Sequence, residues 1–147
     1  MKCSRVLSLV SFLLFSFAPC FAHHMAVIVN KDNNTGEITS AHLARMFRLE
    51  TRKWADGRDV VIVLHKDSGG ETLTLGRLNK MSSNELKSFI SSHKESLMFV
   101  DSDADVLRFV EATPGAVGLV EVRSIDDQVN VLKVDGKLPM EAGYLPH

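Results

Sequence analysis

The sequence predicts an α/β domain in which strands and helices alternate along the chain. Three short apolar runs, at residues 26–30, 60–64 and 116–120, are rich in aliphatic and β-branched side chains and are typical of buried strands. Segments with apolar residues at helical spacing lie between these runs, behind Ser or Thr residues that can cap a helix. Elements that alternate in this way favour one layered domain built around a sheet.

The first strand and the first helix are predicted from residues 26–47. A polar loop at residues 31–36 follows the first apolar run. Thr39 and Ser40 then stand where their side-chain oxygens can accept hydrogen bonds from the free amides at the start of a helix. The buried face of this helix is predicted to carry Leu43, Met46 and Phe47.

The strongest strand signal lies at residues 60–64, after a turn at residues 53–57. Its unbroken apolarity predicts burial on both faces of the sheet. Residues 65–72 follow as a glycine-containing loop that is predicted to open a second helix. Residues 72–75 alternate as they would in a strand, which competes with the helical interpretation of this segment.

Two more helices are predicted from their capping residues. Ser82 with Glu85 fits a capping box, and Ser102 with Asp105 is a looser version of it. The apolar residues that follow at helical spacing are Leu86, Phe89 and Ile90 in one segment and Val106, Phe109 and Val110 in the other. Thr-Pro-Gly then ends the last helix, before predicted strands at 116–120 and 129–134 and an Asp-Gly turn.

Residues 1–22 have the composition of a secretory signal peptide. A positive start precedes the almost entirely apolar residues 6–17, and small residues occupy positions −3 and −1 of a predicted cleavage after Ala22. The apolar run is short for a bilayer span. An uncleaved signal anchor and a lipoprotein acylated on Cys20 are the alternatives, although the residues before Cys20 suit lipoprotein processing poorly.

Cleavage after Ala22 leaves residues 23–147 as one predicted domain in the periplasm. Both cysteines, Cys3 and Cys20, belong to the signal, so no disulfide or thiol chemistry is expected in the mature domain. That domain has 15 basic and 18 acidic residues, a formal charge of −3. Because a nucleic-acid-binding protein usually has a basic excess or a clustered basic face, no nucleic-acid partner is expected.

The loop after the second apolar run has the clearest candidate binding residues. Ser68, Gly69 and Gly70 can present backbone amides and a hydroxyl at a strand-to-helix junction, an arrangement that binds anions. Glycines also permit the close approach and unusual dihedrals that such a loop needs. A two-glycine loop at the start of a helix is more often a simple turn than an anion site, and both interpretations stay open at this point.

Three stretches together resemble one known family. Residues 43–56 contain Leu-Ala-Arg-Met-Phe and then Arg-Lys-Trp-Ala-Asp, and residues 60–70 are an apolar run that leads into Asp-Ser-Gly-Gly. Residues 110–120 contain the most specific motif, Thr-Pro-Gly-Ala-Val-Gly-Leu-Val. This combination is similar to the substrate-binding proteins of phosphate ABC transporters, which have the two-lobed type 2 periplasmic-binding-protein fold.

The resemblance implies a single lobe of that fold, with a mixed sheet flanked by helices. The matched stretches all belong to one lobe of the family, and the chain is too short for two. The resemblance also implies phosphate or a similar small oxyanion as the ligand. The residues it places around the anion are Ser68, Gly69, Gly70 and Thr72 as contacts, with His65 or Lys66 as counter-charge.

Two departures from the family pattern concern the ligand. His65 stands where the resemblance implies an arginine, and a histidine is mostly neutral near physiological pH. Glu71 stands where it implies a hydroxyl. A carboxylate facing the anion at about 4 Å would cost roughly 4 kcal/mol at an effective dielectric constant of about 20. The interpretation preferred from the sequence instead points Glu71 to solvent on the first helical turn, where it favours the macrodipole.

Other residues are expected to have structural roles. His23 and His24 would begin the mature chain and could bind copper, but exposed terminal histidines are the preferred explanation. The remaining histidines have no zinc spacing, so no metal and no cofactor are expected. Ser68 lacks a nucleophile-elbow pattern, so no enzymatic activity is expected. Trp54 is expected in the core rather than as a partner anchor.

The sequence supports two hypotheses of function. The first is a periplasmic module that binds phosphate or a similar oxyanion, either alone or as a homodimer whose two copies close a cleft around the ligand. The second is a periplasmic interaction domain that keeps the fold, has lost the ligand, and contacts an envelope protein or a transporter.

Overall fold

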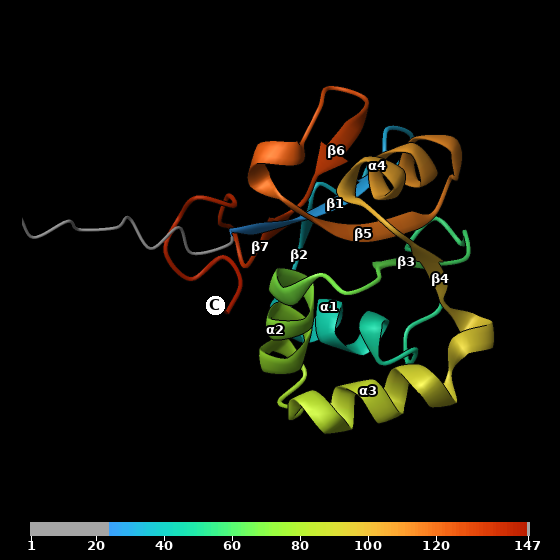
Figure 1. Ribbon diagram of the computed structural model, residues 1–147. Coiled ribbons are helices and arrows are strands. Elements are labelled where there is room, and N and C mark those ends of the chain that lie inside the picture. The colour runs from blue at the N-terminus through green and yellow to red at the C-terminus, as the bar shows by residue number, and fades with distance from the viewer. Residues whose placement is uncertain (1–23, 147) are drawn as a thin grey trace, which may run out of the picture.

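The computed structural model describes residues 24–146, so the predicted signal peptide lies outside the described residues. A mixed sheet of five strands has the order β4-β3-β5-β1-β6 (Figure 1). Its strands are β1 (Met25–Asn30), β3 (Val61–His65), β4 (Met98–Val100), β5 (Ala116–Glu121) and β6 (Val129–Val131). β3 runs parallel to β4 and β5, whereas β1 is antiparallel to β5 and β6. The predicted α/β class with a mixed sheet is confirmed.

Helices cover both faces of this sheet. They are α1 (Ser40–Phe47), α2 (Gly69–Leu78), α3 (Ser83–Ser92) and α4 (Asp103–Ala112). One core cluster joins α1, α2 and α3 to the sheet face that carries Val27 and Val29. A second cluster packs α4 on the opposite face, against Ile28 and Val63. Because both faces are covered, every residue of β1 is buried. No helix within residues 24–146 is long and apolar enough to cross a bilayer.

The helix starts predicted from Ser and Thr residues are confirmed. Thr39 caps α1 through its hydroxyl, which accepts a hydrogen bond from a backbone amide of the first turn. Ser82 and Glu85 form a complete capping box at the start of α3. Ser102 caps α4 by accepting from the Asp105 amide at 3.1 Å. Residues 72–75 lie inside α2, so their strand-like alternation does not determine their structure.

The segment predicted as one strand at residues 129–134 forms two strands in different sheets. β6 pairs with β1, and β7 (Lys133–Val134) then pairs in parallel with β2 (Glu37–Ile38) in a separate two-stranded sheet. Between them, the Leu132 amide donates to the Val27 carbonyl at 2.9 Å. The sequence does not predict β2 and β4, because two or three residues are too few to show a period.

Trp54 belongs to the core beside the turn that follows α4, as expected. It is 6% exposed, and its Nε1 donates to the Gly115 carbonyl at 2.8 Å. Gly115 has a φ of 86°, and a Cβ at this position would lie 2.2 Å from the Asp59 carbonyl oxygen. Only glycine therefore fits this turn, which joins α4 to β5.

Candidate functional site

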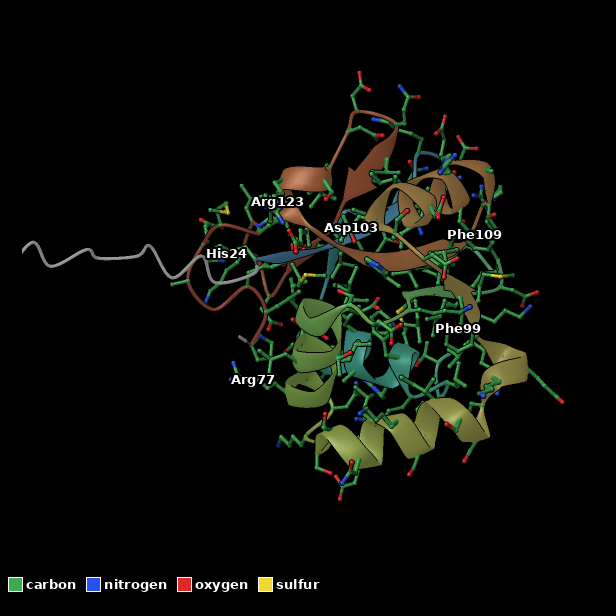
Figure 2. All side chains as sticks on the ribbon, viewed as in Figure 1. His24, Arg77, Phe99, Asp103, Phe109 and Arg123 are labelled. Carbon is green, nitrogen blue, oxygen red and sulfur yellow. The ribbon has the colours of Figure 1, made fainter. Side chains whose placement is uncertain are left out.

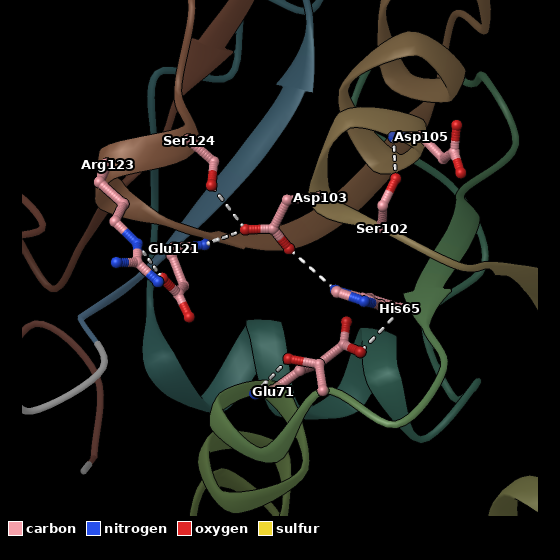
Figure 3. Close-up of polar contacts among 9 residues, drawn as sticks. His65, Glu71, Ser102, Asp103, Asp105, Glu121, Arg123 and Ser124 are labelled. Atoms are coloured by element: carbon pink, nitrogen blue, oxygen red, sulfur yellow. Dashed lines mark hydrogen bonds and ion pairs between the residues drawn. The ribbon is translucent and has the colours of Figure 1, made fainter.

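The candidate site lies at the edge of the sheet where the parallel strands β3, β4 and β5 have their carboxyl ends. α2 follows β3 and α4 follows β4, so both helices begin at this edge. Ligands of α/β proteins usually bind outside the carboxyl ends of parallel strands. Figure 3 shows that polar side chains from these elements converge here, including His65, Glu71 and Asp103.

The first turn of α2 carries two amides without a protein acceptor. Ser68 caps the helix: its Oγ accepts from the Glu71 amide at 3.3 Å, and its carbonyl accepts from the Thr72 amide at 3.0 Å. The amides of Gly69 and Gly70 have no acceptor within residues 24–146. These two donors lie at the positive end of the helix dipole, where an anion is favoured.

The glycines of this loop do not supply its unusual dihedral, contrary to expectation. The residue of the loop with a positive φ is Asp67, at 59°. At Gly69, a Cβ would meet no atom within 4 Å, so packing does not require a glycine there. What the glycines provide is uncovered backbone, because no side chain shields their amides from solvent or from a ligand.

Glu71 does not point to solvent, and the sequence-based interpretation is wrong on this point. The residue is 3% exposed, and its Oε2 accepts from the His65 amide at 2.8 Å. Its Oε1 is buried and has no hydrogen-bond partner within residues 24–146. The physical reason is the His65 amide at the end of β3, a buried donor that the carboxyl group satisfies by turning back from α2.

The burial of Glu71 changes its charge. Loss of hydration raises the pKa of Glu71 well above its ordinary value, and the hydrogen bond from the His65 amide only partly opposes this. The negative charge of Asp103 raises the pKa further. Glu71 therefore stays protonated to a higher pH than an exposed glutamate, and in that neutral form it does not repel an anion.

His65 is held by Asp103, a residue that the sequence analysis did not single out. The His65 Nδ1 lies 2.9 Å from the Asp103 Oδ1. The Asp103 Oδ2 accepts from the Glu121 amide at 3.0 Å and from the Ser124 Oγ at 2.8 Å (Figure 3). Asp103 thus ties together the ends of β3, α4 and β5. The only sequence signal for it was its position directly after the Ser102 cap.

Two hollows flank the first turn of α2, with volumes of about 230 Å³ and about 590 Å³. His65 and Lys66 line the smaller one, and Gly69 lines the larger one. Asp67, Thr72 and Lys87 line both. Lys87 projects from α3 and brings a second cation to this region. The sequence pattern gave no sign of this, since α3 is a separate helix and only the tertiary fold places it beside α2.

No family model matches the chain, but solved structures do. The ABC-type phosphate transport receptor of Vibrio cholerae is 18% identical, with a TM-score of 0.59 over 79% of this chain and 48% of that one. PstS from Borrelia burgdorferi is 20% identical, with a TM-score of 0.64 over 79% and 49%. A phosphate-bound protein of Clostridium perfringens, assigned to phosphate ABC transporter substrate-binding proteins, is 21% identical, with a TM-score of 0.65 over 79% and 46%.

The chain has the fold of one lobe of these phosphate-binding proteins. The expectation of a periplasmic-binding-protein-like lobe is therefore confirmed at the level of the fold. The chain spans less than half the length of each of these three solved structures.

Within this phosphate-binding-protein-like lobe, the predicted contact residues all lie near the N-terminal end of α2, but their side chains do not all surround one ligand position. His65 faces Asp103, and the Lys66 Nζ lies 3.9 Å from the Asp101 Oδ1 at the surface. Ser68 serves as the helix cap. The groups left for a ligand are the glycine amides of the first turn, the Thr72 side chain and the two lysines.

No group of three or more His, Cys, Asp or Glu side chains within residues 24–146 is arranged to hold a metal ion. The pair His23 and His24, considered for copper, lies partly outside the described residues.

Proposed function

We propose that this lobe binds phosphate or a similar small oxyanion at the first turn of α2, in the periplasm. The observation that carries the proposal is the pair of unbonded amides of Gly69 and Gly70 at the positive end of a ten-residue helix. The fold adds support, because solved proteins that share it are phosphate receptors and one of them holds phosphate.

Several side chains would complete the anion site. The Thr72 hydroxyl lies one turn into the helix, and Lys66 and Lys87 bring positive charge to the hollows on either side. Glu71 is compatible with an anion while it is protonated, because the neutral carboxyl group adds no negative charge beside the site. Ionisation of Glu71 adds a repulsive charge.

The predicted affinity is low because the site is open on one lobe. A dissociation constant on the order of 1 mM corresponds to a binding free energy of about 4 kcal/mol, which a few exposed contacts can supply. Two copies facing each other would enclose the ligand and raise this affinity. Size-exclusion chromatography with and without phosphate tests this homodimer: a single monomer peak under both conditions excludes it.

Isothermal titration of the purified protein tests the oxyanion site. Phosphate or sulfate is expected to bind in the millimolar range, and Lys87→Gln is expected to weaken binding about fivefold, since an exposed ion pair contributes up to ~1 kcal/mol. Lys94→Gln, on the exposed helical turn after α3, is the matched control and is expected to bind normally. Absence of heat with both anions at millimolar concentration would contradict the proposal.

Sulfate also isolates the effect of Glu71, because the charge of sulfate is constant over the relevant pH range. Sulfate affinity is expected to fall as the pH rises through the raised pKa of Glu71. Glu71→Gln keeps a hydrogen-bond acceptor for the His65 amide and is expected to remove this pH dependence. An unchanged pH profile in the variant would show that Glu71 does not face the ligand.

A second candidate function is an interaction domain that keeps the fold without the ligand. The observation that favours it is the carboxyl group of Glu71 at the base of the loop, with Asp103 beside it, where both oppose an anion when ionised. The partner would be an envelope protein or a transporter. Cross-linking in intact cells tests this: a specific envelope partner retained by Ser68→Ala and Glu71→Gln supports it, and its absence rejects it.

The periplasmic location rests on the predicted cleavage after Ala22. Mass spectrometry of the protein purified from cells is expected to give a chain that begins at His23. A chain that retains residues 1–22 would contradict the cleaved signal and favour the anchor.

A further inference from the structure

The largest hollow described on this domain lies away from the start of α2. It has a volume of about 720 Å³, compared with about 590 Å³ and 230 Å³ for the two hollows at the candidate oxyanion site. Its walls are α1, the last turn of α2 with the residues that follow it, and the C-terminal segment 143–146. We call it the α1–α2 groove. It shares no lining residue with the smaller hollow at the oxyanion site, and it shares Arg77 with the larger one.

Positive charge dominates the α1–α2 groove. Its lining includes four cationic side chains, Arg45, Arg48, Arg77 and Lys80, and one acidic side chain, Asp135. The Asp135 Oδ1 accepts from the Ser40 amide at 3.0 Å, and this bond lowers the pKa of Asp135, so the groove contains one negative charge against four positive ones. The groove therefore offers more positive charge than its own acid can balance.

Three of the four cations form no salt bridge within residues 24–146. Arg48 forms a two-point ion pair with Glu50, at 3.0 and 3.2 Å. Arg45 interacts electrostatically with Glu50 but does not form a salt bridge with it. Arg77 and Lys80 form no salt bridge in the described part of the chain. Figure 2 shows Arg77 on the outer side of α2, at the C-terminal segment.

The wall opposite α1 and α2 is fixed in place. Tyr144 is 1% exposed, and its hydroxyl donates to the Leu132 carbonyl at 2.5 Å and accepts from the Val27 amide at 3.2 Å. These bonds attach the C-terminal segment to the main sheet and to the chain between β6 and β7. A groove with a fixed wall loses little conformational entropy when a partner enters it.

The lining of the α1–α2 groove combines apolar and cationic side chains. Ala41 and Ala44 of α1 and Leu145 of the C-terminal segment contribute small or aliphatic surface. The guanidinium groups of arginine match carboxylates with two parallel hydrogen bonds. An extended peptide in which acidic and aliphatic side chains alternate satisfies both parts of this surface.

We propose that the α1–α2 groove binds an acidic, extended segment of a partner protein. A flat bilayer fits a concave surface poorly, because it would touch only the outer edge. Nucleic acid is disfavoured by the formal net charge of the chain, −1, which provides no long-range attraction for a polyanion. The proposal goes beyond the oxyanion site and does not depend on it.

Arg45 and Arg77 also lie in the last turns of their helices, where a cation stabilises the helix dipole. This role affects stability and requires no partner. The test must therefore measure binding, and it must use variants that change the net charge equally on other surfaces.

Fluorescence anisotropy with the full-length protein and a fluorescein-labelled peptide of alternating Glu and Leu provides this test. The double variant Arg45→Gln with Arg77→Gln is expected to bind about tenfold more weakly, since each exposed pair contributes up to ~1 kcal/mol. Arg58→Gln with Arg108→Gln is the matched control, because both arginines are exposed and pair with other residues. The control is expected to bind as the natural protein does, and binding is expected to weaken with salt.

The proposal would be overturned if the natural protein does not bind the peptide, or if the two double variants lose the same affinity for it. Tighter binding of a single-stranded oligonucleotide or of phosphatidylglycerol vesicles than of the peptide would also overturn it. So would self-association that Arg45→Gln with Arg77→Gln abolishes, because the occupant of the groove would then be a second copy of the protein. Retained peptide binding by Glu71→Gln and Lys87→Gln would show that the groove acts separately from the oxyanion site.

Discussion

Helices α2 and α3 begin with the same pattern, Ser-x-x-Glu, yet their glutamates lie in opposite environments. In both helices the serine Oγ accepts from the amide of the glutamate, at 3.3 Å for Ser68 and 3.1 Å for Ser82. In α3 the Glu85 Oε2 accepts from the Ser82 amide at 2.8 Å and closes an exposed capping box. In α2 the Glu71 Oε2 accepts from the His65 amide instead and is buried.

The difference arises from what surrounds each helix start. The Ser68 amide already donates to the His65 carbonyl, so it has less need of Glu71 as an acceptor. The His65 amide, at the end of a central strand, has no acceptor closer than the Glu71 carboxyl. The serine cap is thus a local property of the sequence, whereas the position of the glutamate depends on the strand before the helix.

The largest expected effect is the difference in stability between variants that truncate each of the two glutamates to alanine. Glu71→Ala is expected to lower the free energy of unfolding by about 2 kcal/mol, because the buried His65 amide loses its acceptor. Glu85→Ala removes one exposed hydrogen bond and is expected to cost about 0.5 kcal/mol. Urea denaturation at mildly acidic pH, where Glu71 is neutral, measures both. Equal losses would mean that the burial of Glu71 does not contribute to stability.

The second expected effect is a pH dependence of stability that Glu71 causes and Glu85 does not. The pKa of Glu71 is raised in the folded state above its ordinary value of 4.5, so the folded protein binds more protons than the unfolded chain. Stability from this group is complete below pH 4.5 and falls as the pH rises toward the folded-state pKa, by up to about 1.4 kcal/mol per pH unit.

Thermal unfolding across this pH range measures the effect. Glu71→Gln is expected to flatten the decline, while Glu85→Gln serves as the matched control and keeps the profile of the natural protein. If the natural protein and Glu71→Gln instead have the same pH profile of stability above pH 4.5, the Glu71 carboxyl group is hydrated or paired in solution.

The same distinction between local and tertiary causes explains what the sequence predicts about the fold. The caps at Thr39, Ser82 and Ser102 are predictable because the serine or threonine and the amide it binds are three residues apart. The division of residues 129–134 between two sheets is not predictable, because it depends on a pairing of β7 with β2, nearly the full length of the domain away in sequence.

The candidate site divides in the same way. The loop at the start of α2 was found from its own residues, Ser68 to Gly70, and from the family resemblance. Asp103 was not found, because its contact with His65 spans 38 positions of sequence. Lys87 was missed for the same reason. The cations of the α1–α2 groove form two pairs, Arg45 with Arg48 and Arg77 with Lys80, and Arg48 and Arg77 are 29 positions apart, so the linear sequence shows no single basic cluster.

The smallest expected effect compares the two serine caps. Ser82→Ala is expected to cost about 1 kcal/mol, as loss of an N-cap usually does, and Ser68→Ala about 0.5 kcal/mol, because its bond to the Glu71 amide is longer. Ser68→Ala is also expected to leave sulfate affinity unchanged, since the amides of Gly69 and Gly70 remain in place. If Ser68→Ala instead abolishes sulfate binding while costing no more stability than this, the Ser68 hydroxyl contacts the anion directly. The cap would then be only one of its two roles, and α2 would differ from α3 in its serine as well as in its glutamate.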